Sequence, residues 1–138
     1  MELEEGIIDL VCDLKKKCIE NDSKFISDLN ISDSEYNFIK TLITCKNMNS
    51  KSIANKMRLS PSRVSRIIDN MVINGYLSRK NAKEDRRNIN INLTKKGDNL
   101  VEKVVDFREE CETIIIKSLT KKESEVIKSI LNKIINSL

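Results

Sequence analysis

The sequence predicts a mainly α-helical fold with one small β-hairpin, and three observations support this prediction. Apolar residues recur every three to four positions along most of the chain, the spacing of amphipathic helices. Residues 89–93 instead alternate apolar and polar side chains, the pattern of a half-buried strand. The length of 138 residues and the 39% apolar content suit one domain with a core, or one domain plus a helical extension.

The N-terminal third of the chain predicts two helices. Apolar spacings of three, four and seven indicate an amphipathic helix over residues 3–20, and Asn21-Asp22-Ser23 acts as a break after it. Ser32 and Glu35 then form a capping box, in which the serine is the N-cap and the glutamate follows three residues later. This capping box opens a second helix, which carries an apolar face up to Ile43.

Two short helices joined by a tight turn follow. The first covers 51–57, and Leu59 lies in the turn. Ser60-Pro61 is the clearest helix start in the chain, because serine is a preferred N-cap and proline is tolerated at the first helical position. The helix that starts there reaches Gly75, because a glycine in the left-handed conformation commonly ends a helix. The two short helices together form a helix-turn-helix, whose second helix is expected to enter the DNA major groove.

A hairpin comes directly after this unit. Residues 76–80 and 89–93 predict two strands, and the charged loop 81–88 joins them. A charged hairpin in this place is the wing of a winged helix. An arginine at its tip suits a narrow minor groove, so Arg87 is expected to enter one. Asp85 can hold that arginine extended through a charge-assisted hydrogen bond.

The C-terminal third of the chain predicts two long helices. Thr94 caps the first, and Thr120 with Glu123 forms a second capping box that starts the last helix. Ile114-Ile115-Ile116 is apolar on more than one face, and the last helix stays apolar up to Leu138. Helices of this kind need a partner surface, which packing within one chain or a second copy would supply.

The charge is unevenly distributed. The chain has a net charge of +4, but residues 51–97 carry 12 basic and 3 acidic side chains, so the rest is acidic. Arginine is more skewed than lysine, since six of the seven arginines fall in that segment: Arg58, Arg63, Arg66, Arg79, Arg86 and Arg87. The planar guanidinium fork matches phosphates and guanine edges. This distribution points to an anionic polymer as partner.

The candidate DNA-binding residues lie at two helix starts and on the wing. They are Lys51, Ser52, Pro61, Ser62, Arg63, Ser65, Arg66, Asp85, Arg86 and Arg87. Lys51 and Ser52 are phosphate candidates because they lie at a helix N-terminus. The early residues of the second helix are of types that read bases or bind phosphate.

Several motifs together resemble the MarR family of bacterial transcriptional regulators. They are Ile53-Ala54, the run Val64-Ser65-Arg66-Ile67-Ile68-Asp69-Asn70-Met71, Gly75-Tyr76-Leu77, Arg79, Asp85-Arg86-Arg87 and Leu93-Thr94-Lys95-Lys96-Gly97. The resemblance implies a homodimer that binds a pseudo-palindromic DNA operator, most simply a repressor that a small-molecule effector releases. The absence of an export signal predicts a cytoplasmic protein. It also places Asn70 where relatives can reach phosphate.

The implied domain organisation has three parts. Residues 1–31 would be an N-terminal dimerisation helix and linker, 32–97 the winged helix-turn-helix DNA-binding domain, and 98–138 the C-terminal dimerisation helices. A thiol-based sensor is an alternative, since some oxidant-sensing relatives place a reactive cysteine at about the position of Cys12. Nearby lysines would supply the positive charge that stabilises a thiolate. The competing interpretation makes Cys12, Cys18, Cys45 and Cys111 small apolar core residues.

Other function classes find no support in the sequence. The chain has no histidine, so His-based metal sites, a histidine general base and a Ser-His-Asp triad are excluded. There is also no nucleophile–base pair and no Gly-rich phosphate loop, so we expect no enzyme, no metal and no cofactor. The acidic N-terminus argues against a signal peptide, and no membrane partner is expected. A winged-helix module that binds another protein rather than DNA remains an alternative.

Overall fold

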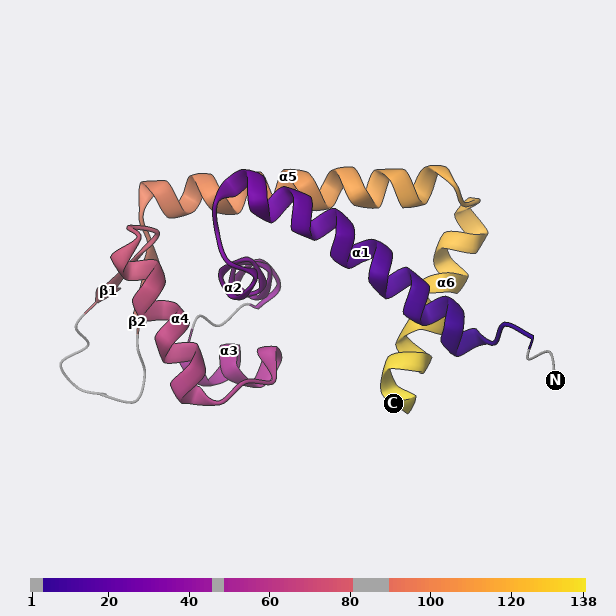
Figure 1. Cartoon of the computed structure of the whole chain (residues 1–138), viewed down its shortest axis with the longest axis horizontal. Coiled ribbons are helices and arrows are strands. Elements are labelled where there is room, and N and C mark those ends of the chain that lie inside the picture. The colour runs from indigo at the N-terminus through magenta and orange to yellow at the C-terminus, as the bar shows by residue number, and fades with distance from the viewer. Residues whose placement is uncertain (1–3, 46–48, 81–89) are drawn as a thin grey trace. The chain divides into compact units, whose positions relative to one another are not determined.

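The computed structural model describes residues 4–45, 49–80 and 90–138 (Figure 1). These residues contain α1 (Ile7–Leu29), α2 (Asp33–Thr44), α3 (Ser50–Met57), α4 (Pro61–Ile73), β1 (Leu77–Lys80), β2 (Asn90–Leu93), α5 (Lys95–Lys117) and α6 (Lys121–Ser137). The mainly helical class and the predicted order of elements are therefore confirmed. The chain divides into two compact units, Met1–Val101 and Glu102–Leu138, each described by itself below.

Helix α1 is longer than predicted. The expected break at residues 21–23 is wrong, because the helix continues to Leu29 and ends at Asn30, which has a left-handed φ of 55°. Asparagine is one of the residues that tolerate this conformation. The added turns carry contacts to α2 that stabilise the helix: Ile26 is buried, and the Phe25 ring meets the Tyr36 ring edge-on at 6.0 Å between centroids.

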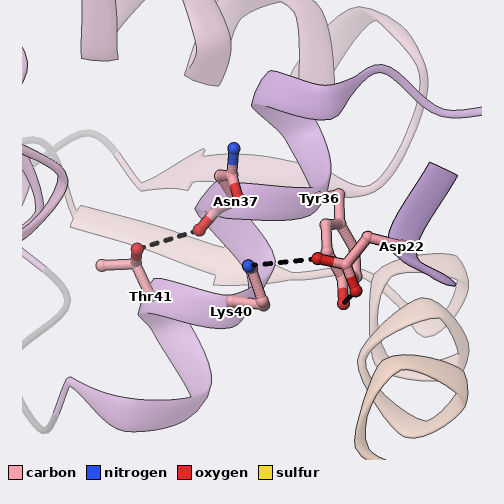
Figure 2. A network of polar contacts seen from close by, with 5 residues as sticks. All are labelled: Asp22, Tyr36, Asn37, Lys40 and Thr41. Atoms are coloured by element: carbon pink, nitrogen blue, oxygen red, sulfur yellow. Dashed lines mark hydrogen bonds and ion pairs between the residues drawn. The ribbon is translucent and has the colours of Figure 1, made fainter. Parts of the chain in front are cut away.

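Polar contacts also tie α1 to α2 (Figure 2). Tyr36 donates its hydroxyl to Asp22 Oδ1 at 3.1 Å, and Lys40 Nζ lies 3.9 Å from Asp22 Oδ2. The Lys40 ammonium also lies over the Tyr36 ring, 4.7 Å from its centroid. Asp22, which the sequence pattern places in a helix break, therefore has partners on α2 that keep it within the helix.

The core of the first unit lies between α2, α3, α4 and the hairpin. Its fully buried side chains include Phe38 and Ile39 of α2, Ile53 of α3 and Ile68 of α4. Ala54 of α3 is also buried in this core, whereas Met57 is only half-buried. This core fixes α3 and α4 against α2 and leaves their opposite faces exposed.

The two strands form an antiparallel pair. Leu77 lies opposite Leu93 and Arg79 opposite Ile91, so the apolar side chains of Leu77 and Ile91 both lie in the core. The first strand begins one residue later than predicted. The predicted strand start at residue 89 and the loop 81–88 lie outside the described residues.

The start of α5 is joined closely to the end of α4. Gly75 ends α4 with a φ of 83°, as predicted for a left-handed residue. Thr94 donates its hydroxyl to the Gly75 carbonyl at 2.5 Å and accepts from the Gly97 N–H at 3.1 Å. Its own N–H donates to the Tyr76 carbonyl at 3.1 Å. One threonine therefore caps α5 and anchors it to the turn before the wing.

The second unit consists of the rest of α5 and of α6. The predicted capping box of α6 is confirmed: Glu123 N donates to Thr120 Oγ1 at 3.1 Å, and Thr120 N donates to Glu123 Oε1 at 3.3 Å. None of the residues of α6 is buried in the single chain. Among the described residues, no helix is long and apolar enough to cross a membrane.

Candidate nucleic-acid interface

Helices α3 and α4 form the predicted helix-turn-helix, with only residues 58–60 between them. Ser60 caps α4 by accepting from the Arg63 N–H at 3.3 Å, and Pro61 occupies the first helical position. At the other end of the turn, the Leu59 N–H donates to the Ala54 carbonyl at 3.1 Å and closes α3. Both helix ends are thus fixed by local hydrogen bonds, which sets how the N-terminus of α4 projects.

Helix α4 has one buried and one exposed face. Val64, Ile67, Ile68 and Met71 are buried. The predicted contact residues lie on the other side: Pro61, Ser62, Arg63, Arg66 and Asn70 are exposed and Ser65 is partly exposed. The helix can therefore present its N-terminal polar residues to a groove without disturbing the core.

The N-terminus of α3 differs from the expectation in one respect. Asn49, which was not among the predicted caps, caps α3 by accepting from the Ser52 N–H at 2.7 Å. That N–H is therefore already bonded, and a phosphate here would meet the exposed Lys51 side chain and the half-buried Ser52. Any phosphate contact in this region thus depends on side chains more than on the open end of the helix.

The wing contributes one contact that the sequence pattern does not predict. Arg79 of β1 donates to Asp69 Oδ1 of α4, so the arginine links the wing strand to the helix-turn-helix. No local signal reveals this pair, since ten residues separate its members. The predicted wing-tip residues Asp85, Arg86 and Arg87 lie outside the described residues.

The exposed surface of this region is strongly basic. Between residues 49 and 80, Asp69 is the single acidic residue, and its carboxylate is engaged by Arg79. Besides Arg79, the exposed cationic side chains of the same segment are Lys51, Lys56, Arg58, Arg63 and Arg66. Lys56 and Arg58 were not among the predicted contacts, although Arg58 belongs to the arginine cluster. These charges give the helix-turn-helix a surface suited to an anionic polymer.

Residues 31–89, which contain the helix-turn-helix and β1, match the model of the MarR family. This part of the chain is therefore similar to the MarR family. The six helices and two-stranded antiparallel wing of the chain, counted over the described residues, are those of the MarR fold.

Three individual proteins illustrate the similarity. The HTH-type transcriptional regulator PrsX of Escherichia coli is 29% identical over 96 residues, which cover 68% of this chain and 58% of PrsX. The MepR–DNA complex of S. aureus has a TM-score of 0.81 at 21% identity, over 97% of this chain and 98% of MepR. A MarR protein from Peptoclostridium difficile has a TM-score of 0.80 at 18% identity, over 98% and 88%. The chain thus spans about three fifths of the length of PrsX. The MepR and Peptoclostridium difficile structures have the same fold as this chain.

The cysteines of this chain do not form part of its core. Cys12 and Cys18 are exposed on α1, and Cys45 and Cys111 are partly exposed. The interpretation of all four as buried core residues is therefore wrong for the single chain. Cys12 has the access that a reactive thiol requires, and the exposed Lys15 and Lys16 follow it on the same helix.

Proposed function

We propose that this chain is a homodimeric, sequence-specific DNA-binding transcriptional regulator of the MarR family. One observation carries the proposal: Arg63 and Arg66 project from the exposed face of α4 while the opposite face is held in the core. An arginine at such a position can bind the O6 and N7 atoms of guanine in the major groove. The simplest form of the regulator is a cytoplasmic repressor that a small-molecule effector releases from its operator.

The other predicted contacts would position α4 rather than read sequence. Lys51, Ser52 and Asn70 would bind phosphates on either side of the groove, and contacts of this kind fix register without carrying sequence information. Arg87, held by Asp85, would add a minor-groove contact from the wing, with Arg86 beside it. The likeness to MepR, solved as a complex with DNA, and to PrsX, named as a transcriptional regulator, supports this assignment.

Binding should weaken steeply with salt. A labelled duplex from the region upstream of the chain's own gene is titrated with protein at 50–200 mM salt. A regulator that makes about 6–10 phosphate contacts loses roughly 10³–10⁵-fold in affinity over that range. A scrambled duplex of equal length measures specificity. Weak binding with a flat salt dependence would contradict the proposal and favour the alternative of a winged-helix module that binds protein.

Exposed apolar faces support a homodimer. Three helices, α1, α5 and α6, expose large apolar side chains. In α1 these are Ile7, Ile8, Leu10 and Leu14. In α5 they are Ile114, Ile115 and Ile116, and in α6 they are Val126, Ile127, Ile130, Leu131 and Ile135. Faces of this extent on a chain without a membrane-spanning helix among its described residues mark protein interfaces. A two-fold dimer would present two copies of α4 to half-sites about one DNA turn, ~10 bp, apart.

The substitution Ile130→Glu should dissociate the dimer. Ile130 is 43% exposed in the single chain, and burial of that exposed part against a second copy would contribute about 1 kcal/mol per subunit. A glutamate buried there adds a desolvation penalty, so the dimer dissociation constant should rise at least about 100-fold. Light scattering coupled to size-exclusion chromatography measures the mass of each species.

Asn132→Glu provides the matched control, because it adds the same charge at an exposed polar position on the same helix. This variant should remain dimeric. If Ile130→Glu also keeps the mass of two chains at micromolar concentration, α6 does not form the interface.

A further inference from the structure

The turn of the helix-turn-helix holds an arginine in a backbone conformation that arginine rarely adopts. Arg58 has φ 55° and ψ 41°, in the left-handed region. Glycine enters this region without steric cost, and asparagine tolerates it better than other side chains do. Among the described residues other than glycine, Asn30 alone shares a positive φ, and there the chain uses asparagine.

The fold requires this conformation but gains little from the side chain. The Arg58 N–H donates to the Asn55 carbonyl at 3.3 Å and the Leu59 N–H to the Ala54 carbonyl at 3.1 Å, which closes α3 and starts the turn. Within residues 4–45, 49–80 and 90–138, the exposed guanidinium makes no hydrogen bond or ion pair. A cation favours a helix C-terminus, but Lys56 in the last turn of α3 already supplies one.

Arg58 lies close to the N-terminus of α4, the part of the helix that is proposed to contact bases. It lies two residues before Ser60, the N-cap of α4, so their Cα atoms are at most about 7.6 Å apart. The major groove is about 12 Å wide. When the N-terminus of α4 lies in that groove, the long Arg58 side chain in the turn is within reach of the sugar-phosphate backbone at the groove edge.

We propose that Arg58 binds a DNA phosphate at the edge of the groove that α4 enters and thereby fixes the register of α4. The inference rests on the proposed function and adds a contact residue to it. It explains why the turn carries an arginine where glycine would fit with less strain. A phosphate contact contributes affinity and salt dependence but carries no base preference.

The test uses Arg58→Gly and Arg58→Lys in the full-length chain. Arg58→Gly removes the charge and relieves the backbone strain, so its melting temperature should equal or exceed that of the wild type. Its affinity for the upstream duplex should fall about 10-fold. The slope of log K against log salt should become shallower by about 0.9 for each phosphate that the variant no longer binds. Arg58→Lys should keep most of the slope, since a lysine also binds phosphate.

The ratio of affinities for the upstream and scrambled duplexes separates phosphate binding from base reading. An unchanged ratio in Arg58→Gly supports the proposal, and a collapsed ratio overturns it in favour of a base contact. A lower melting temperature in Arg58→Gly overturns it in favour of a structural role. Wild-type affinity and slope in Arg58→Gly overturn it while leaving the proposed function intact. Failure of the wild-type chain itself to bind DNA refutes the proposed function instead.

Discussion

Replacing Gly97 with alanine is expected to destabilise the first unit by about 3 kcal/mol, although the residue lies in a helix. Gly97 is buried in the first turn of α5. A Cβ atom there would lie 2.0 Å from the Tyr76 carbonyl oxygen and 3.0 Å from Leu93 Cδ2. The Tyr76 carbonyl cannot withdraw easily, because it accepts the Thr94 N–H at 3.1 Å.

The expected change in stability is opposite in sign to the change that helix propensity predicts. Alanine is normally better than glycine in a helix interior by about 1 kcal/mol, so helix propensity alone predicts stabilisation. Urea unfolding followed by circular dichroism measures the free energy of unfolding. Gly6→Ala is the steric control, since its nearest contact would be Asp9 Oδ2 at 3.6 Å, an ordinary distance. Because Gly6 is the N-cap of α1, where alanine is disfavoured, this variant should lose about 1 kcal/mol or less. A Gly97→Ala chain as stable as the wild type would contradict the close approach of α5 to Tyr76.

Removing both arginines from the exposed face of α4 is expected to abolish specific DNA binding without affecting the fold. A bidentate arginine contributes about 1–3 kcal/mol of discrimination at its base pair. If Arg63 and Arg66 each make such a contact, the double alanine variant loses roughly 30-fold to 10⁴-fold in affinity. Both side chains are exposed, so the free energy of unfolding should change by less than about 0.5 kcal/mol.

Fluorescence anisotropy with the upstream and scrambled duplexes measures the loss of affinity. The matched control is Lys103→Ala with Arg108→Ala, which removes the same charge from exposed positions on α5. If the two arginines acted only through long-range electrostatic attraction to DNA, both double variants would lose a similar amount of affinity. Specific reading by α4 requires a much larger loss of affinity, and a collapsed preference for the upstream duplex, in the Arg63/Arg66 variant alone. Equal losses would refute the role of the two arginines as base contacts.

Features that depend on a few neighbouring residues are predicted well from the sequence. Ser60 and Pro61 start α4 as expected, and Thr120 with Glu123 forms the expected capping box. Their hydrogen bonds close within one helical turn, so the residue types and their spacing contain all that is needed. Strand β2 follows likewise from strict alternation of apolar and polar residues. The basic exposed face of α4 follows from helical periodicity, because buried positions determine which residues are left outside.

Where the prediction is wrong, a tertiary contact outweighs a local preference. Asn21-Asp22-Ser23 has the composition of a helix break, yet α1 continues through it to Leu29. Asp22 accepts the Tyr36 hydroxyl and lies next to the Lys40 ammonium, both from α2. Ile26, one turn further on, is buried. Helix propensity differences of less than about 1 kcal/mol per residue are easily reversed by such contacts.

The sequence by itself therefore determined the order of elements, the helix caps, the strand pattern and the basic character of the helix-turn-helix. Tertiary structure alone decided that Arg79 bonds to Asp69, that Gly97 leaves room only for a hydrogen atom against Tyr76, and that Arg58 occupies a left-handed turn. The first two join residues that are distant along the chain, and the third depends on how two helices pack. Local rules act over one turn of helix or one strand pair, whereas these features depend on which distant backbone segments the core brings into contact.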